Sequence, residues 1–289
     1  MNYQGTDHLS YLLQTTNCKL TVCRTIITRM TQVRAKKHLG QHFLKDQEIA
    51  RRIAESLPLR QATPVLEIGP GTGVLTRFLL QNPLIHLKAV EIDSESVSYL
   101  HEHYPELDII EGDFLNMDLR EIYAEPFCII GNFPYNISSQ ILFKVLDYKD
   151  HIPCVAGMFQ KEVAERIASK PGKKAHGILS VFMQAYYEVE YLFTVSEEVF
   201  DPPPKVKSAV IRFTRNEVDK LDCDEKFFRT VVKTAFNQRR KTLRNSLSSL
   251  VNKSNPIFED VLYSQRPEQL DVESFVRITN ELSGIISGE

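Results

Sequence analysis

Three closely spaced glycines interrupt an apolar stretch, and they constrain the fold more than any other feature of the sequence. Residues 65–76 read Val-Leu-Glu-Ile-Gly-Pro-Gly-Thr-Gly-Val-Leu-Thr, which is typical of a strand, a tight loop and a helix. Glycine permits positive φ and close approach of a ligand, so we expect the loop to form the floor of a pocket. The spacing differs from both the dinucleotide fingerprint and the lysine-containing P-loop. A flexible connecting turn without a ligand is the alternative interpretation.

Two acidic residues follow later apolar segments, where parallel strands would end at the same edge of a sheet. Glu91 lies 20 residues beyond Gly71, the distance at which a nucleotide fold places a carboxylate on ribose hydroxyls. Asp113 is suited to accept a hydrogen bond from an exocyclic amine, and Phe114 to cover an adenine ring. Taken singly, these residues also fit a surface acid and an ordinary turn. Together they predict a site for an adenosine-bearing ligand without phosphates.

The segment from Asn132 to Tyr135 is the most specific chemical signal in the chain. It follows a predicted strand over 127–131 and reads Asn-Phe-Pro-Tyr. The Asn132 side-chain oxygen and the Pro134 carbonyl are both suited to accept hydrogen bonds from an amino group on an aromatic ring, which aims the nitrogen lone pair at an electrophile. Tyr135 offers a ring for stacking on the base. A proline turn before a helix capped by Ser138 or Ser139 is the structural alternative.

Charge is distributed unevenly, although the formal net charge is only −2. Between Lys205 and Lys253 the chain has thirteen Lys and Arg against five Asp and Glu, whereas residues 254–289 have two against seven. We interpret Arg239, Arg240, Lys241 and Arg244 as part of a helix over 239–250 that binds nucleic-acid phosphates. A solvated surface helix is the alternative.

Cysteine usage and hydropathy restrict the compartment. The five cysteines form no metal-binding or disulfide pattern, and their odd number favours a reducing cytoplasm. No apolar run approaches the roughly 18 residues of a membrane span. Residues 1–30 lack periodicity, so we expect a disordered extension, with Met30 as a second candidate start and a transit peptide as a weaker interpretation.

The remaining patterns suggest two folded parts. A basic arm containing Lys36 and Lys37 leads to Asp46, which we predict to cap a helix ending near Leu57. A catalytic domain is expected over residues 31–216, with a strand over 208–213 closing its sheet, and a helical RNA-binding domain over 217–289.

With these motifs in this order, the sequence resembles the class I S-adenosylmethionine-dependent methyltransferases, and within them the small-subunit ribosomal RNA adenine dimethyltransferases of the KsgA type. The resemblance runs from about Lys36 to near the end and includes Gly-Gln-His-Phe-Leu, Gly-Asn-Phe-Pro-Tyr-Asn and Phe-Asn-Gln-Arg-Arg-Lys-Thr-Leu-Arg-Asn. It implies an α/β fold with a Rossmann-like methyltransferase sheet, mostly parallel with an antiparallel strand near its edge, and a small C-terminal all-helical domain. One departure is His42, where the family usually has asparagine.

The resemblance also implies the site residues. Cofactor binding is expected from His42, Leu44, Gly69, Gly71, Glu91, Asp113 and Asn132, and catalysis from Asn132, Pro134, Tyr135 and Phe200, where Phe200 would stack on the target adenine. RNA binding is assigned to Lys36, Lys37, Lys205, Arg239, Arg240, Lys241 and Arg244.

The implied reaction transfers two methyl groups from S-adenosylmethionine to N6 of each of two adjacent adenosines near the 3′ end of small-subunit (16S) ribosomal RNA, giving S-adenosylhomocysteine. We expect no metal and no membrane association, a monomer, and a pre-30S particle as the partner. Two alternatives stay open: a large-subunit ribosomal RNA adenine methylase, and a ribosome-assembly or RNA-binding factor that retains the fold.

Overall fold

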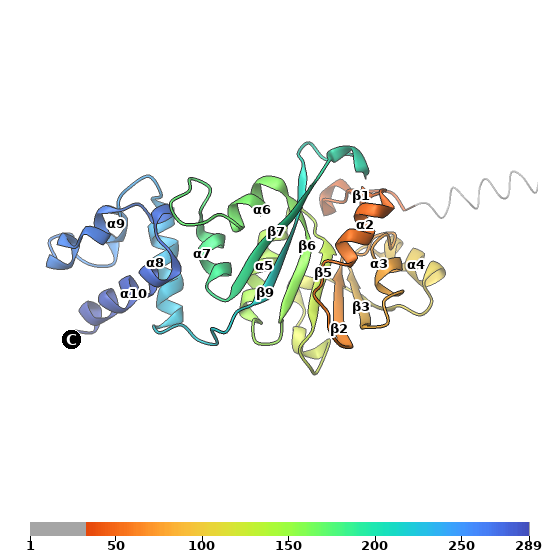
Figure 1. Cartoon of the computed structure of the whole chain (residues 1–289), viewed down its shortest axis with the longest axis horizontal. Coiled ribbons are helices and arrows are strands. Elements are labelled where there is room, and N and C mark those ends of the chain that lie inside the picture. Colours follow the sequence, from red (N-terminus) through yellow and green to blue (C-terminus); the bar gives the residue numbers. More distant parts are fainter. Residues whose placement is uncertain (1–32, 289) are drawn as a thin grey trace, which may run out of the picture. The chain divides into compact units, whose positions relative to one another are not determined.

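A seven-stranded sheet organises the structure, a computed structural model that describes residues 33–288 (Figure 1). The strand order is β4-β3-β2-β5-β6-β9-β7, in which β2 to β6 run parallel and β9 is antiparallel to both of its neighbours. The predicted Rossmann-like sheet, with an antiparallel strand near its edge, is therefore confirmed. The strands are β2 (Thr63–Ile68), β3 (Ile85–Glu91), β4 (Asp108–Glu111), β5 (Cys128–Asn132), β6 (Cys154–Gln160), β7 (Tyr187–Val195) and β9 (Ser208–Arg215).

Both faces of the central strands are buried, because alternate side chains enter different cores. Leu66 belongs to a core shared with α5 (Ser138–Asp147) and α7 (Ile178–Gln184). Its neighbour Val65 belongs to a core shared with α2 (Gln47–Ala54) and α3 (Thr76–Leu79). Burial on both faces explains why these strands read as continuous apolar runs. The other helices of this part are α4 (Ser94–His103) and α6 (Lys161–Ile167).

Asp46 caps α2, as the sequence predicts. Its side chain accepts hydrogen bonds from the backbone N–H groups of Glu48 and Ile49, at 2.9 and 3.0 Å, and so satisfies donors that the first helical turn leaves unpaired. The helix ends at Ala54, before the predicted end near Leu57.

The predicted strand over 208–213 is present, but it does not form the edge of the sheet. This strand, β9, lies between β6 and β7, and β7 forms the edge. The sequence carries a signal for β7, since Tyr187 and Val189 alternate with Glu188 and Glu190. In the structure Tyr187 is buried and Val189 half-buried, whereas both glutamates are exposed. Such alternation is typical of a strand with one covered face.

Helices follow β9, and they share the core of the sheet. Phe228 and Val231 on α8 (Glu225–Asn237) and Phe275 on α10 (Val272–Ser287) belong to the same cluster as Phe213 on β9. Residues 36–288 accordingly belong to one compact unit. The domain boundary at 216/217 stays a prediction, and the predicted extension over residues 1–30 lies outside the described part of the chain.

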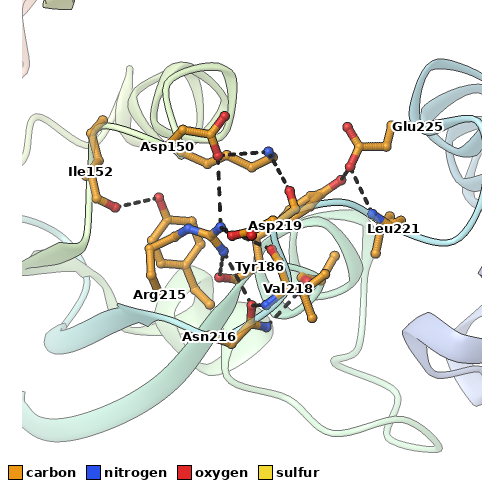
Figure 2. A network of polar contacts seen from close by, with 12 residues as sticks. Asp150, Ile152, Tyr186, Arg215, Asn216, Val218, Asp219, Leu221 and Glu225 are labelled. Atoms are coloured by element: carbon orange, nitrogen blue, oxygen red, sulfur yellow. Dashed lines mark hydrogen bonds and ion pairs between the residues drawn. The ribbon is translucent and has the colours of Figure 1, made fainter. Parts of the chain in front are cut away.

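The connection between β9 and α8 is pinned by polar contacts (Figure 2). The Arg215 guanidinium donates hydrogen bonds to the carbonyls of Tyr186 and Val218, at 2.6 and 3.0 Å. The Tyr186 hydroxyl in turn donates to the Glu225 carboxylate in the first turn of α8, at 2.8 Å. The start of α8 is therefore fixed against the end of β9.

The predicted helix over 239–250 is present only from Leu243 onward. The helix α8 ends at Asn237, and Arg239 to Lys241 form a turn before the short α9 (Leu243–Ser246) and a 3-10 helix, η5 (Leu247–Ser249). The Leu243 N–H donates to the carbonyl of Gln265, at 2.8 Å, rather than to a preceding helical turn. Tertiary pairing of the Leu243 N–H thus takes the place of the first turn of the helix that local composition favours.

Candidate active site

A cavity of about 190 Å³ lies at the carboxyl ends of the parallel strands. Its walls come from the arm before α2, the glycine loop, and the segments that follow β3, β4 and β5. This is the edge at which open α/β sheets bind ligands. The cavity brings together nine of the residues predicted from the sequence: His42, Leu44, Gly69, Gly71, Glu91, Asp113, Asn132, Pro134 and Tyr135.

The glycine loop has the backbone conformation that its composition predicts. Gly69, Gly71 and Gly73 have φ values of 65°, 58° and 78°, which other residues rarely adopt. A Cβ on Gly71 would also lie 2.9 Å from Cε1 of Phe43. The loop therefore has no side chain at three positions and lies close to Phe43 in the arm. Both features are expected of a surface that a ligand contacts.

Glu91 is buried in the cavity wall, where its carboxylate accepts three backbone N–H groups. These come from Gly71 at 3.0 Å, Ile92 at 2.9 Å and Asp93 at 3.0 Å. Burial raises the pKa of this carboxyl, and the backbone hydrogen bonds oppose the rise. A carboxylate offers about four acceptor sites, so the arrangement orients Glu91 and leaves capacity for a hydroxyl. Its predicted contact with ribose stays a prediction.

Glu67 is a second buried carboxyl in the wall, and no role was predicted for it from the sequence. It is 2% exposed and accepts a hydrogen bond from the Thr76 hydroxyl at 2.7 Å. Burial raises its pKa to about 8, and the negative charge of Glu91 adds to the effect.

The segment after β4 forms the wall on the side predicted to hold adenine. Asp113 accepts a hydrogen bond from the Leu115 N–H at 2.9 Å and starts the 3-10 helix η2 (Phe114–Asn116). Phe114 is only 3% exposed. Ile92, which the sequence analysis missed, lines the same cavity with 50% exposure. Its signal was an apolar residue directly after an acidic strand end.

The Asn132 amide is held in one orientation. Its Nδ2 donates to the His42 carbonyl at 3.1 Å, which directs Oδ1 away from that contact as an acceptor. The ring of Tyr135 stacks on His42 with 5.7 Å between centroids, and its hydroxyl is hydrogen-bonded to Ser208. His42 donates through Nδ1 to the Pro202 carbonyl at 2.8 Å. The His42 donor at this atom is therefore used within the protein.

Phe200 lies apart from the cavity. It is 1% exposed and packs in the core beside α2, where β8 (Phe200–Asp201) pairs with β1 (Phe43–Leu44). It is absent from the cavity lining. Its predicted stacking role stays a prediction that would require exposure of the ring.

The arm is fastened over the cavity by Lys36. Its ammonium lies 2.5 Å from a carboxylate oxygen of Asp93 and 3.3 Å from one of Glu95. Gln41 donates to the other Asp93 oxygen at 3.3 Å. The charge of Lys36, assigned from the sequence to RNA, is thus engaged in holding the arm.

The other predicted RNA-binding residues lie on loops and helix ends. Arg239 is half-buried, and its guanidinium donates to the Lys174 carbonyl and lies 4.0 Å from the Glu268 carboxylate. The remaining members are exposed and make no ion pair within residues 33–288: Lys37, Lys205, Arg240, Lys241 and Arg244.

The cavity chemistry fits a ligand that carries positive charge and lacks phosphates. Among the described residues, no Lys or Arg lines the cavity, whereas the acidic residues Glu91 and Asp113 do. Carboxylates bind hydroxyls and amines, whereas a phosphate would call for cations or a helix N-terminus. S-adenosylmethionine has the required amine, sulfonium and ribose. No group of His, Cys, Asp and Glu in this part of the chain is placed to hold a metal ion, and the expectation of a metal-free protein stays a prediction.

Two solved structures share this fold over most of the chain. A dimethyladenosine transferase from Plasmodium falciparum matches with a TM-score of 0.71 and 26% identity, over 84% of this chain and 98% of that chain. A 23S rRNA methyltransferase, ErmE, matches with a TM-score of 0.64 and 27% identity, over 82% of this chain and 99% of that chain.

Sequence relatives are closer. A protein of Parabacteroides distasonis named ribosomal RNA small subunit methyltransferase A is 61% identical over 86% of this chain and 94% of its own length. The family model described as ribosomal RNA adenine dimethylase matches residues 32–283. That span includes the whole cavity and the basic loops, so the chain belongs to the ribosomal RNA adenine dimethylase family.

Proposed function

We propose that this chain transfers methyl groups from S-adenosylmethionine to N6 of two adjacent adenosines near the 3′ end of small-subunit ribosomal RNA, two methyl groups to each. Membership of the adenine dimethylase family and the name of the 61% identical relative support the reaction and the subunit. When bound, the cofactor supplies an electrophilic methyl group on a positively charged sulfur.

The orientation of Asn132 is the observation that carries the proposal. With Nδ2 committed to the His42 carbonyl, Oδ1 is the part of the amide that faces a target amino group as an acceptor. The Pro134 carbonyl lies in the same cavity wall. Two acceptors on one amino group favour a tetrahedral nitrogen whose lone pair points at the methyl donor, so positioning supplies most of the catalysis.

A basic surface away from the cavity supports an RNA substrate. The loop over 170–174 contains exposed Lys170, Lys173 and Lys174. The Arg239 guanidinium binds the Lys174 carbonyl, and the Gly172 N–H donates to the Glu268 carbonyl at 2.9 Å. These contacts bring the loop over 170–174 beside Arg239 and Glu268, which are distant from it in sequence. We define the basic surface as Lys170, Lys173, Lys174, Arg240 and Lys241, and assign it to RNA phosphates.

Arg239 has a different role in this proposal. Because its guanidinium contacts Lys174 and Glu268, we propose that Arg239 holds the loop over 170–174 in place. The exposed side chains on either side of it would contact RNA.

A pre-30S particle in the cytoplasm is the partner and location that follow from this substrate, and we propose that the chain acts as a monomer. No helix within residues 33–288 has the length and hydropathy needed to cross a membrane. A large-subunit substrate is the second candidate within the same chemistry, because the 23S rRNA methyltransferase shares the fold. The lower similarity of that protein, compared with the 61% identical relative, favours the small subunit.

The deciding experiment incubates the protein with labelled S-adenosylmethionine and ribosomal particles from cells that lack this modification. We expect dimethyladenosine in small-subunit RNA, located by mass spectrometry of RNA fragments. Label in large-subunit RNA would instead support the second candidate. Absence of label in both, with cofactor binding intact, would favour a binding factor without turnover.

Substitution Asn132→Ala tests the assigned chemistry. It removes the oriented acceptor, so we expect methyl transfer to fall by at least about 10²-fold, while binding of small-subunit particles is kept. Equal loss of transfer and of particle binding would refute the assigned role of Asn132. Substitution Asn280→Ala is a matched control for truncation, because the Asn280 side chain also donates to a backbone carbonyl, that of Asp222 at 2.7 Å, but lies outside the cavity lining.

A further inference from the structure

Lys144 on α5 reaches back to the segment that forms the predicted adenine side of the cavity. Its ammonium donates hydrogen bonds to the carbonyl of Leu115, at 2.9 Å, and to the carbonyl of Met117. It also lies 5.4 Å from the ring centroid of Phe114 and 5.7 Å from that of Tyr148. A cation over aromatic rings is attracted by their faces, and more strongly where water is partly excluded.

The carbonyls that Lys144 binds belong to a segment whose other side lines the cavity. Leu115 and Phe114 are lining residues themselves. The methyl group of Met117 packs against Gly112, 2.5 Å from where a Cβ on that glycine would lie. Displacement of Leu115 or Met117 would therefore move the wall directly, together with Asp113, whose carboxylate accepts from the Leu115 N–H.

Among the described residues, the ammonium of Lys144 contacts backbone carbonyls and aromatic rings rather than a carboxylate. No carboxylate within residues 33–288 lies within 4.0 Å of its ammonium as an ion pair, and its side chain is only half-exposed. Desolvation lowers the pKa of the ammonium, and the charges of Asp113, Asp118 and Asp147 oppose the shift. A partly desolvated cation that binds carbonyls makes strong hydrogen bonds, so the contacts tie the segment firmly to α5.

The helix that carries Lys144 begins three residues after Tyr135. One end of α5 thus follows the segment predicted to hold the target base, and Lys144 in its last turn binds a second segment that lines the same cavity.

We propose that Lys144 is a positioning residue for cofactor binding: it holds Asp113 to Leu115 in the conformation that receives the adenosine part of the cofactor. The inference rests on the cofactor of the proposed function but not on which RNA is methylated. Its test therefore uses cofactor binding without RNA.

Equilibrium binding of S-adenosylhomocysteine, measured by calorimetry, is the primary readout. Lys144→Met keeps the length of the side chain and removes the donors, so we expect affinity to fall about tenfold, consistent with the loss of hydrogen bonds to a charged group. In turnover with ribosomal particles, KM for S-adenosylmethionine should rise by a similar factor while kcat changes less than about twofold. Lys144→Arg, which retains charge and donors, should recover at least half of the lost binding free energy.

Lys149→Met is the matched control. Lys149 also donates to a backbone carbonyl, that of Asp219 at 3.0 Å, and lies 5.0 Å from an aromatic ring centroid, that of Tyr186, but it is outside the cavity wall. We expect unchanged affinity for S-adenosylhomocysteine in this variant. Unchanged affinity in Lys144→Met, or equal losses in both variants, would overturn the inference. If Lys144→Met does not fold, the same comparison is made with Lys144→Gln. This variant keeps one donor group, the side-chain NH2, and loses the charge. An affinity for S-adenosylhomocysteine equal to that of the unsubstituted protein would again overturn the inference.

Discussion

The cavity and the basic surface are built in opposite ways. In the cavity, each predicted cofactor residue is the last residue of a strand, follows a strand end closely, or lies in the arm before α2, and parallel pairing of the strands brings their ends together. In the basic surface, the charged residues lie on loops that are joined by the contacts of Arg239 and Glu268. Strand topology places the first set, and individual side chains place the second.

The two regions therefore treat positive charge differently. No Lys or Arg within residues 33–288 lines the cavity, and Lys36 near its mouth is neutralised by Asp93 and Glu95. On the basic surface, Arg240 and Lys241 are exposed and Arg239 is engaged. A basic residue in a motif can thus be a ligand contact or an internal clamp, and only its partners distinguish the two.

Gly71→Ala should produce the largest effect of the changes that separate the regions. The new Cβ would strain a backbone with φ of 58° and would meet Phe43 at 2.9 Å. Strain of about 1–3 kcal/mol, together with displacement of the arm, predicts a loss of S-adenosylhomocysteine affinity between about 10-fold and about 100-fold. Calorimetry measures it directly.

The control for Gly71→Ala lies on the other region. Gly172 has φ of 85°, but nothing lies within 4 Å of where its Cβ would be. Gly172→Ala should strain the basic loop and leave cofactor affinity unchanged. A similar loss of cofactor affinity in both variants would mean that the two regions are not independent.

An intermediate effect is expected on RNA binding. Replacing Arg240 and Lys241 together by Gln removes two exposed charges, which should weaken binding to small-subunit RNA about tenfold and reduce the slope of log affinity against log salt by about 2. Titrations at several salt concentrations give both quantities.

Arg239→Lys sharpens the distinction between contact and clamp. It preserves the charge but loses the planar fork of donors, so a clamp should be weakened although the net charge is unchanged. We expect weaker RNA binding with little change in the salt slope. Full binding by this variant would show that Arg239 acts only through its charge.

The same contrast explains how much the sequence predicted. Asp46 as a cap and the cavity residues at strand ends follow from local patterns and from the rule that parallel strands end at one edge. The predicted helix over 239–250 begins only at Leu243, whose N–H pairs with the Gln265 carbonyl, a contact that no local pattern indicates.

Partners far apart in sequence also decide individual side chains. Lys36 and Asp93 are 57 residues apart, and Lys144 and Leu115 are 29 apart. The exposure of Phe200 likewise depends on pairing of β8 with β1. Residue type alone indicated charge or aromatic character at these positions, but not what each side chain contacts.

The smallest effect on activity at neutral pH should come from Glu67→Gln, which tests the electrostatics of the cavity. Burial raises the pKa of Glu67 from its ordinary value of 4.5 to about 8, so the folded state binds more protons than the unfolded state between these values. Stability should therefore fall as pH rises through this range, by up to about 1.4 kcal/mol per pH unit. The glutamine amide of this variant cannot ionise and should abolish that part of the dependence, whereas Glu188→Gln on the exposed face of β7 should keep it. Urea unfolding at about pH 4, 6 and 9, values that bracket the two pKa values, measures the difference. Parallel curves for Glu67→Gln and the unsubstituted protein would show that this carboxyl is not perturbed by burial.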